Sequence, residues 1–203
     1  MLDRYFISPQ EKLLGRPAEW LVRRGVSADM LTITGFLIGL SAVPLIAFGQ
    51  FGLALVAILV NRLFDGLDGV VARLSGPTDR GAFLDIALDF FFYATIPFAF
   101  VLVDPVANAV PGAMLLLSFV GTGSSFLAFA VIAERRGLTS LCMPKKGLYY
   151  LGGIAEGTET IAFLVLACLL PQAFPILATI FAGLCFVTAL ARWWWGYTAF
   201  SAR

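Results

Sequence analysis

Four aspartates, arranged in two pairs, are the residues of this chain whose type and spacing could support chemistry. Asp65 and Asp68 are separated by three positions and Asp85 and Asp89 by four, so each pair would project from one face of its own helix. The polar segment 74–80 between the pairs can turn the chain back and bring the two faces together. Four converging carboxylates repel one another unless cations neutralise them, and hard oxygen ligands suit magnesium, manganese or calcium rather than zinc. The spacing therefore predicts a divalent metal site.

Residues around the aspartates favour a phosphate-containing ligand. Gly66, Gly69 and Gly81 leave space for a bulky group to approach the backbone, and Arg73 supplies a planar cation suited to phosphate. An alternative interpretation is that the aspartates form buried salt bridges. Only Arg62 and Arg73 are near in sequence, however, which is too few for four carboxylates.

Composition limits the function classes. The 203 residues are 60% hydrophobic, and the mean hydropathy is +0.90, which is typical of a polytopic membrane protein. Histidine is absent, so no imidazole can act as base or ligand. The three cysteines, Cys142, Cys168 and Cys185, have no zinc-binding spacing. A net charge of +1 gives no support for a nucleic-acid partner.

The expected fold is an all-α integral membrane domain with six transmembrane helices after an N-terminal cytoplasmic amphipathic helix. Residues 8–24 combine a capping box with apolar and basic faces, which predicts that amphipathic helix at the membrane interface, although a plain linker remains an alternative. We expect two regions, an interfacial segment (1–26) and a six-helix domain (27–203). The predicted spans, each near the ~20 residues that a bilayer requires, are about 29–48, 51–73, 81–103, 110–133, 148–170 and 175–197.

Basic residues predict the orientation. Of 14 lysines and arginines, five precede the first span, two flank the turn between spans two and three, four lie between spans four and five, and two lie at the C-terminal end. The remaining one, Arg62, lies inside span two, and none falls in the other three turns. The positive-inside rule then places both termini and the aspartates on the cytoplasmic side of the inner membrane.

The fixed positions of the aspartate region resemble the complete signature of the CDP-alcohol phosphotransferases, also called CDP-alcohol phosphatidyltransferases. That signature in this chain is Asp65-x2-Asp68-Gly69-x2-Ala72-Arg73-x7-Gly81-x3-Asp85-x3-Asp89. The resemblance implies an integral membrane enzyme of phospholipid biosynthesis that transfers a substituted phosphate from a CDP-linked donor to an alcohol and releases CMP. The expected donor is CDP-diacylglycerol, and the expected acceptor is a small alcohol or alcohol phosphate. The family's first span often opens with Pro-Asn-x-Leu-Thr, where this chain has Ala28-Asp-Met-Leu-Thr32.

The same resemblance implies roles for individual residues. Asp65, Asp68 and Asp85 would be ligands of Mg²⁺ or Mn²⁺, and Asp89 would be both a ligand and the general base for the acceptor hydroxyl. Residues expected to contact the cytidine diphosphate are Gly69, Ala72, Arg73, Thr78 and Gly81.

Two sets of residues are candidates for the acceptor site. Arg135, Arg136, Lys145 and Lys146 could receive an acceptor phosphate, or could be the basic loop that orientation alone requires. Glu156 and Glu159 could form an acceptor pocket, or could pair with Arg62 or neighbouring hydroxyl groups.

Two other function classes compete with group transfer. A divalent-cation transporter or channel is disfavoured because the outer halves of spans two and three, 51–59 and 96–103, are almost wholly apolar. A catalytically inactive membrane scaffold is disfavoured because no motif residue is lost. Glycine pairs at 35/39 and 153/157, together with the resemblance, predict a homodimer.

Overall fold

A computed structural model describes residues 3–137 and 153–201, with side chains from residue 13 onward, and no strand occurs in these residues. The helices are α1 (Asp3–Arg23), α2 (Ala28–Leu40), α3 (Ala42–Ala47), α4 (Phe51–Ser75), α5 (Asp79–Val103), α6 (Pro105–Arg135), α7 (Gly157–Leu169), the short 3-10 helix η1 (Pro171–Ala173) and α8 (Phe174–Phe200).

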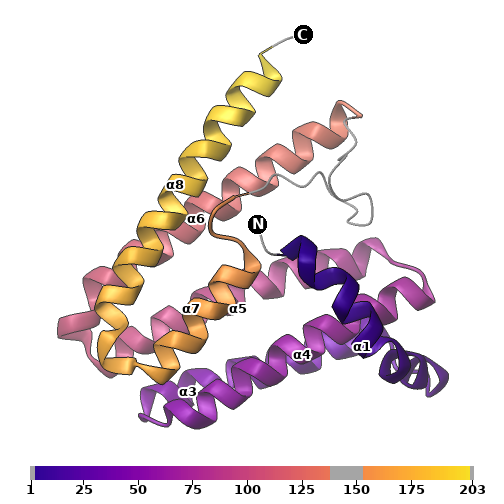
Figure 1. Cartoon of the computed structure of the whole chain (residues 1–203), viewed down its shortest axis with the longest axis horizontal. Helices are drawn as coiled ribbons and strands as arrows, with labels where there is room; N and C mark the ends of the chain where they lie inside the picture. The colour runs from indigo at the N-terminus through magenta and orange to yellow at the C-terminus, as the bar shows by residue number, and fades with distance from the viewer. Residues whose placement is uncertain (1–2, 138–152, 202–203) are drawn as a thin grey trace.

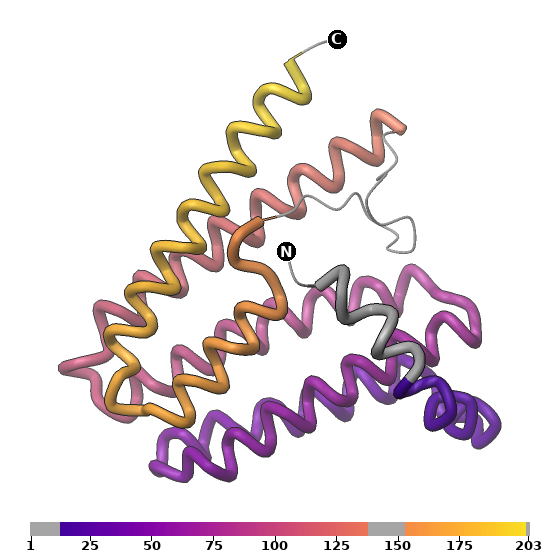
Figure 2. The backbone as a smooth tube through the Cα atoms, in the orientation of Figure 1, coloured from indigo at the N-terminus to yellow at the C-terminus, as the bar shows by residue number. Residues whose placement is uncertain are grey.

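Helices α4 and α5 are consecutive and antiparallel, forming a hairpin, and α2 and α3 each pack against both of them (Figure 1). Helix α4 contacts α1, α2, α3 and α7, while α5 contacts α2, α3 and α6. Helices α6 and α8 pack against each other. Figure 2 shows that both begin on the same side of the molecule and that their C-terminal ends diverge.

Local sequence determines the turn of the hairpin. Helix α4 ends before Gly76, whose φ of 94° lies in the left-handed region that favours glycine. Pro77 follows and cannot continue the helix. Thr78 then caps α5, because its Oγ1 accepts a hydrogen bond of 3.0 Å from the Gly81 backbone N–H. The tight turn brings the two aspartate pairs to facing helices.

Two glycines let α2 approach the hairpin closely. A Cβ atom on Gly35 would lie 2.6 Å from the Phe64 Cβ, and one on Gly39 would lie 2.8 Å from Phe92 and 2.9 Å from Asn61. The Asn61 side chain donates a hydrogen bond of 2.9 Å to the Gly35 carbonyl oxygen. This glycine pair therefore packs within the chain and gives no support to the predicted homodimer, which stays a prediction.

Within residues 3–137 and 153–201, four helical stretches are long and apolar enough to cross a membrane: 28–47, 79–103, 105–135 and 171–200. They match the predicted spans one, three, four and six. Helix α4, the second predicted span, has 25 residues but carries Arg62, Asp65 and Asp68. Helix α7, the fifth, has 13 residues and begins at Gly157, so the helix expected from residue 148 is wrong over residues 153–156.

The first predicted span is divided. Helix α2 ends at Leu40, and α3 resumes at Ala42 after Ser41. Pro44 lacks the N–H that would donate to the Leu40 carbonyl oxygen, which accounts for the break.

Helix α1 lies across the end of α4 that is nearest the turn. Leu14 and Ala18 of α1 are buried against Val70 and Val71 of α4. Leu13 on the same helix is 77% exposed. Part of the apolar stripe predicted to face the membrane therefore packs on the hairpin instead.

Candidate metal and substrate site

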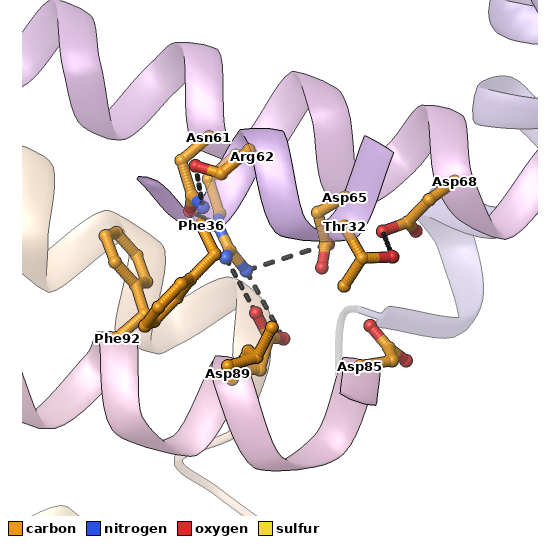
Figure 3. Close-up of a pocket in the computed structure, with 11 residues that line it drawn as sticks. Thr32, Phe36, Asn61, Arg62, Asp65, Asp68, Asp85, Asp89 and Phe92 are labelled. Atoms are coloured by element: carbon orange, nitrogen blue, oxygen red, sulfur yellow. Dashed lines mark hydrogen bonds and ion pairs between the residues drawn. The ribbon is translucent and has the colours of Figure 1, made fainter. Parts of the chain in front are cut away.

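A pocket opens between α2, α4 and α5, and all four motif aspartates line it (Figure 3). Helix α4 contributes the Asp65 and Asp68 carboxylates and α5 those of Asp85 and Asp89. The lining residues are Thr32, Gly35, Phe36, Asn61, Arg62, Asp65, Asp68, Asp85, Leu88, Asp89 and Phe92.

Three of the aspartates converge. One carboxylate oxygen from each of Asp65, Asp68 and Asp85 lies within 4.8 Å of the other two. A cation with oxygen bonds of about 2.1 to 2.4 Å can join ligand atoms up to about 4.2 to 4.8 Å apart. The donor set contains only oxygen, which fits Mg²⁺, Mn²⁺ or Ca²⁺. Asp68 is buried, Asp65 is half-buried and Asp85 is exposed, so the triad is open on one side.

Thr32 orients the buried member of the triad. Its hydroxyl donates a hydrogen bond of 2.6 Å to Asp68 Oδ2. That bond restrains the Asp68 carboxylate and attaches α2 to the acidic pocket. Sequence reasoning assigned no role to Thr32, although it occupies the threonine position of the family's first-span opening.

Asp89 lies apart from the triad and faces Arg62. The Arg62 Nη2 to Asp89 Oδ1 distance is 2.7 Å, and Nη1 to Oδ2 is 3.4 Å. Arg62 also approaches Asp65, with Nη1 3.6 Å from Oδ2. The structure thus brings together three of the four predicted metal ligands and pairs the fourth with an arginine. The salt-bridge interpretation is correct for Asp89, and Arg62 forms a second, longer ion pair with Asp65.

The predicted nucleotide-binding residues surround the hairpin turn. Gly69, Ala72 and Arg73 occupy the last two turns of α4, beyond Asp68. The Arg73 guanidinium lies beside Gly69, with Nη1 3.4 Å from the place a Cβ would occupy. Thr78 and Gly81 begin α5, where the Thr78 hydroxyl is engaged in capping. These residues lie next to the pocket and do not line it.

The two described arginines of the candidate acceptor set do not line the pocket. Arg135 and Arg136 are exposed at the end of α6, and the Arg136 guanidinium donates to the Phe200 carbonyl oxygen at 3.0 Å. Lys145 and Lys146 lie outside the described residues.

The two candidate glutamates have structural partners at the start of α7. Glu159 accepts a hydrogen bond of 3.2 Å from the Glu156 backbone N–H, and the Glu156 carboxylate accepts one from the Gly153 backbone N–H. The predicted alternative of pairing with Arg62 is wrong, because Arg62 contacts the aspartates. Glu156 and Glu159 therefore act, in the described part of the chain, as caps for α7.

Comparisons with known proteins identify the family and the fold. The family model for CDP-alcohol phosphatidyltransferase matches residues 26–194. The inner membrane protein YnjF of Escherichia coli (strain K12) is 49% identical over 197 residues, which cover 97% of this chain and 96% of that protein.

Two solved structures share the fold, and both are of phosphatidylinositol phosphate synthase from Mycobacterium tuberculosis. The structure with CDP-diacylglycerol bound has a TM-score of 0.72 at 21% identity, covering 92% of this chain and 94% of that one. The structure in complex with manganese and citrate has a TM-score of 0.69 at 24% identity, covering 90% of this chain and 88% of that one.

The triad geometry predicts the effect of Asp68→Asn on metal binding. Loss of a buried anionic ligand should weaken Mn²⁺ binding by about tenfold or more, since substitution of a residue that only hydrogen-bonds to a metal ligand already lowers metal affinity by about that much. Titration of the purified protein, followed by the electron paramagnetic resonance of free Mn²⁺, measures the affinity. Asp79→Asn, at the exposed start of α5, is the control and should bind as wild type does. Equal affinity in Asp68→Asn and wild type would contradict the triad as a metal site.

Proposed function

This chain belongs to the CDP-alcohol phosphatidyltransferase family, and we propose that it transfers a phosphatidyl group from CDP-diacylglycerol to a small alcohol or alcohol phosphate, with release of CMP. The observation that carries the proposal is the convergence of Asp65, Asp68 and Asp85 from two helices, with Asp89 in the same pocket. A solved structure that shares the fold holds CDP-diacylglycerol, which supports the choice of donor.

Asp65, Asp68 and Asp85 would hold Mg²⁺ or Mn²⁺, with Asp89 as a further ligand when the substrates are bound. A structure with the same fold contains manganese, which supports a divalent metal. A bound cation would polarise the diphosphate and neutralise the charge of the departing CMP.

The chain's own residues supply binding and proton transfer. Arg73 would pair with the diphosphate. The small residues Gly69, Ala72 and Gly81 would let the diphosphate approach the backbone, and the Thr78 hydroxyl would contact the diphosphate as well. Asp89 would take the proton of the acceptor hydroxyl as that oxygen attacks the phosphorus that carries the diacylglycerol. The bond from this phosphorus to the bridging oxygen then breaks, and CMP leaves with the electron pair.

Among acceptors, we favour one that carries a phosphate. Glu156 and Glu159 are engaged in capping α7, which favours the basic residues as the acceptor site. Arg135 and Arg136 are exposed at the end of α6, and Lys145 and Lys146 lie in the same connection between α6 and α7.

The proposed topology has six membrane crossings, including α4 and α7, with both termini and the pocket at the cytoplasmic side of the inner membrane. The distribution of lysine and arginine supports it, as does the inner-membrane description of YnjF. Cysteines introduced singly at 104 and 203 should react with impermeant reagents from opposite sides of the membrane. Labelling of both from the same side would contradict this topology.

Loss of the Asp89 base should abolish turnover without loss of donor binding. Asp89→Asn keeps the size of the side chain but cannot accept a proton, so CMP release from CDP-diacylglycerol should fall by about 10²- to 10⁴-fold. Release is measured in membranes with added Mg²⁺ and a panel of alcohols, and the lipid products are identified by mass spectrometry. Glu19→Gln, an exposed carboxylate on α1, is the control. No CMP release by wild type with any acceptor would favour the transporter or scaffold alternatives.

The acceptor proposal predicts a selective effect on one KM. The Lys145→Ala/Lys146→Ala variant should raise the KM for a phosphorylated acceptor by about tenfold, as expected for loss of about 1.4 kcal/mol of charge-assisted binding. The KM for CDP-diacylglycerol should not change, because Arg73 binds the donor. The Glu156→Gln/Glu159→Gln variant is the comparison. A higher acceptor KM in that variant alone would assign the acceptor site to the glutamates.

A further inference from the structure

Arg62 is a buried arginine inside the acidic pocket, and the metal chemistry of the motif gives it no role. Its side chain is 10% exposed, and it lies on α4 one turn before Asp65. A charge in such a position is costly unless it is paired. Its partner is Asp89 of α5, which it contacts through two nitrogen atoms at 2.7 and 3.4 Å (Figure 3).

Several neighbours hold the Arg62 guanidinium in place. Nη1 donates a hydrogen bond of 2.8 Å to the Tyr93 hydroxyl, and Nε donates one of 2.8 Å to Asn61 Oδ1. The guanidinium carbon lies 4.8 Å from the centroid of the Phe92 ring and 5.1 Å from that of Tyr93. Hydrogen bonds to neutral partners and contacts with two aromatic rings fix the position of the guanidinium. These partners carry no negative charge, so the positive charge of Arg62 is compensated by the carboxylates.

The charges in the pocket therefore fall into two groups. Asp65, Asp68 and Asp85 converge on a common point, while Asp89 is neutralised by a residue of the chain itself. Arg62 also lies 3.6 Å from the nearest Asp65 oxygen. Any cation held by the triad is thus close to a fixed positive charge, which weakens its binding by Coulomb repulsion.

We propose that Arg62 is a positioning residue that orients the Asp89 carboxylate toward the acceptor hydroxyl and limits the affinity of the triad for its metal. This inference rests on the proposed function, because Asp89 is the base of that reaction. Arg62 keeps the Asp89 carboxylate off the metal until the substrates bind, so that the triad alone holds the metal in the free enzyme. It also keeps the metal exchangeable, since repulsion offsets part of the attraction of three carboxylates.

Metal affinity distinguishes this role from a structural one. With a metal–oxygen bond of about 2.1 Å, the Arg62 charge lies about 6 Å from the ion, and at the dielectric constant of water its removal should raise Mn²⁺ affinity about tenfold. An arginine that only stabilised the fold would leave that affinity unchanged or lower it. The affinity is measured without substrates, by electron paramagnetic resonance of Mn²⁺ with the purified full-length protein.

Four variants make the test specific. Arg62→Gln should bind Mn²⁺ about tenfold more tightly, while kcat for CMP release falls about a hundredfold and the KM for CDP-diacylglycerol changes little. Arg62→Lys keeps the charge and should retain wild-type Mn²⁺ affinity, but it loses the two-nitrogen contact with Asp89, so kcat should fall less than in Arg62→Gln and remain below wild type. Tyr93→Phe removes one hydrogen bond but no charge, so it should lower kcat a few-fold at unchanged Mn²⁺ affinity. Arg23→Gln, an exposed arginine on α1, controls for the loss of one positive charge.

The outcomes separate this proposal from the proposed function. Unchanged or weaker Mn²⁺ binding in Arg62→Gln would overturn the role of Arg62, as would full kcat in that variant. If Arg62→Gln does not fold, Tyr93→Phe decides the question. A Tyr93→Phe variant with wild-type kcat would overturn the role of Arg62. So would a Tyr93→Phe variant whose Mn²⁺ affinity changes while its kcat does not. Failure of wild type to release CMP would refute the proposed function, and the Mn²⁺ titration would still report on the electrostatic effect of Arg62.

Discussion

Charge compensation among four carboxylates is the constraint on which this structure depends. Asp65, Asp68, Asp85 and Asp89 line one pocket in a chain whose surroundings are largely apolar, where uncompensated charge is expensive. The structure compensates these negative charges in two ways. Arg62 lies against Asp89, and the other three carboxylates gather with the spacing of a cation site. The hydroxyl of Thr32 adds a hydrogen bond to the most buried of them.

The helix packing makes this compensation possible. The tight turn at Gly76 keeps α4 and α5 in one hairpin, so that aspartates about 20 residues apart in sequence share a pocket. Gly35 and Gly39 bring α2 close enough for Thr32 to reach Asp68. Helix α7 and the core phenylalanines, including Phe100 and Phe174 stacked at 4.5 Å, support the far end of the hairpin. The glycines at 35 and 39, which sequence analysis assigned to dimer contact, thus serve the pocket of their own chain.

The aspartate motif and the helix layout were predictable, because 3.6-residue periodicity and hydropathy are local properties of the sequence. The family was indicated by the resemblance of the motif to a known signature, while the facing of Asp65 and Asp68 toward Asp85 follows from helical periodicity and a short turn. The partner of Asp89 was not predictable, since Arg62 is 27 residues away and its side-chain direction depends on how α4 and α5 pack. Helix α7 starts later than hydropathy indicates, because Glu156 and Glu159 cap its first turn. Span one is interrupted at Ser41 because Pro44 removes a backbone hydrogen bond, an effect that hydropathy does not register.

The central proposal is that the aspartate triad holds the metal and that the diphosphate of the donor lies between the triad and Arg73, next to the hairpin turn. Crystals of the protein grown with Mn²⁺ and CDP-diacylglycerol would test it through the anomalous scattering of manganese. We expect an anomalous peak within bonding distance of Asp65, Asp68 and Asp85, with the diphosphate beside it and Arg73 in contact with phosphate oxygens. A manganese peak outside this triad, or a donor whose diphosphate lies away from the hairpin turn, would contradict it.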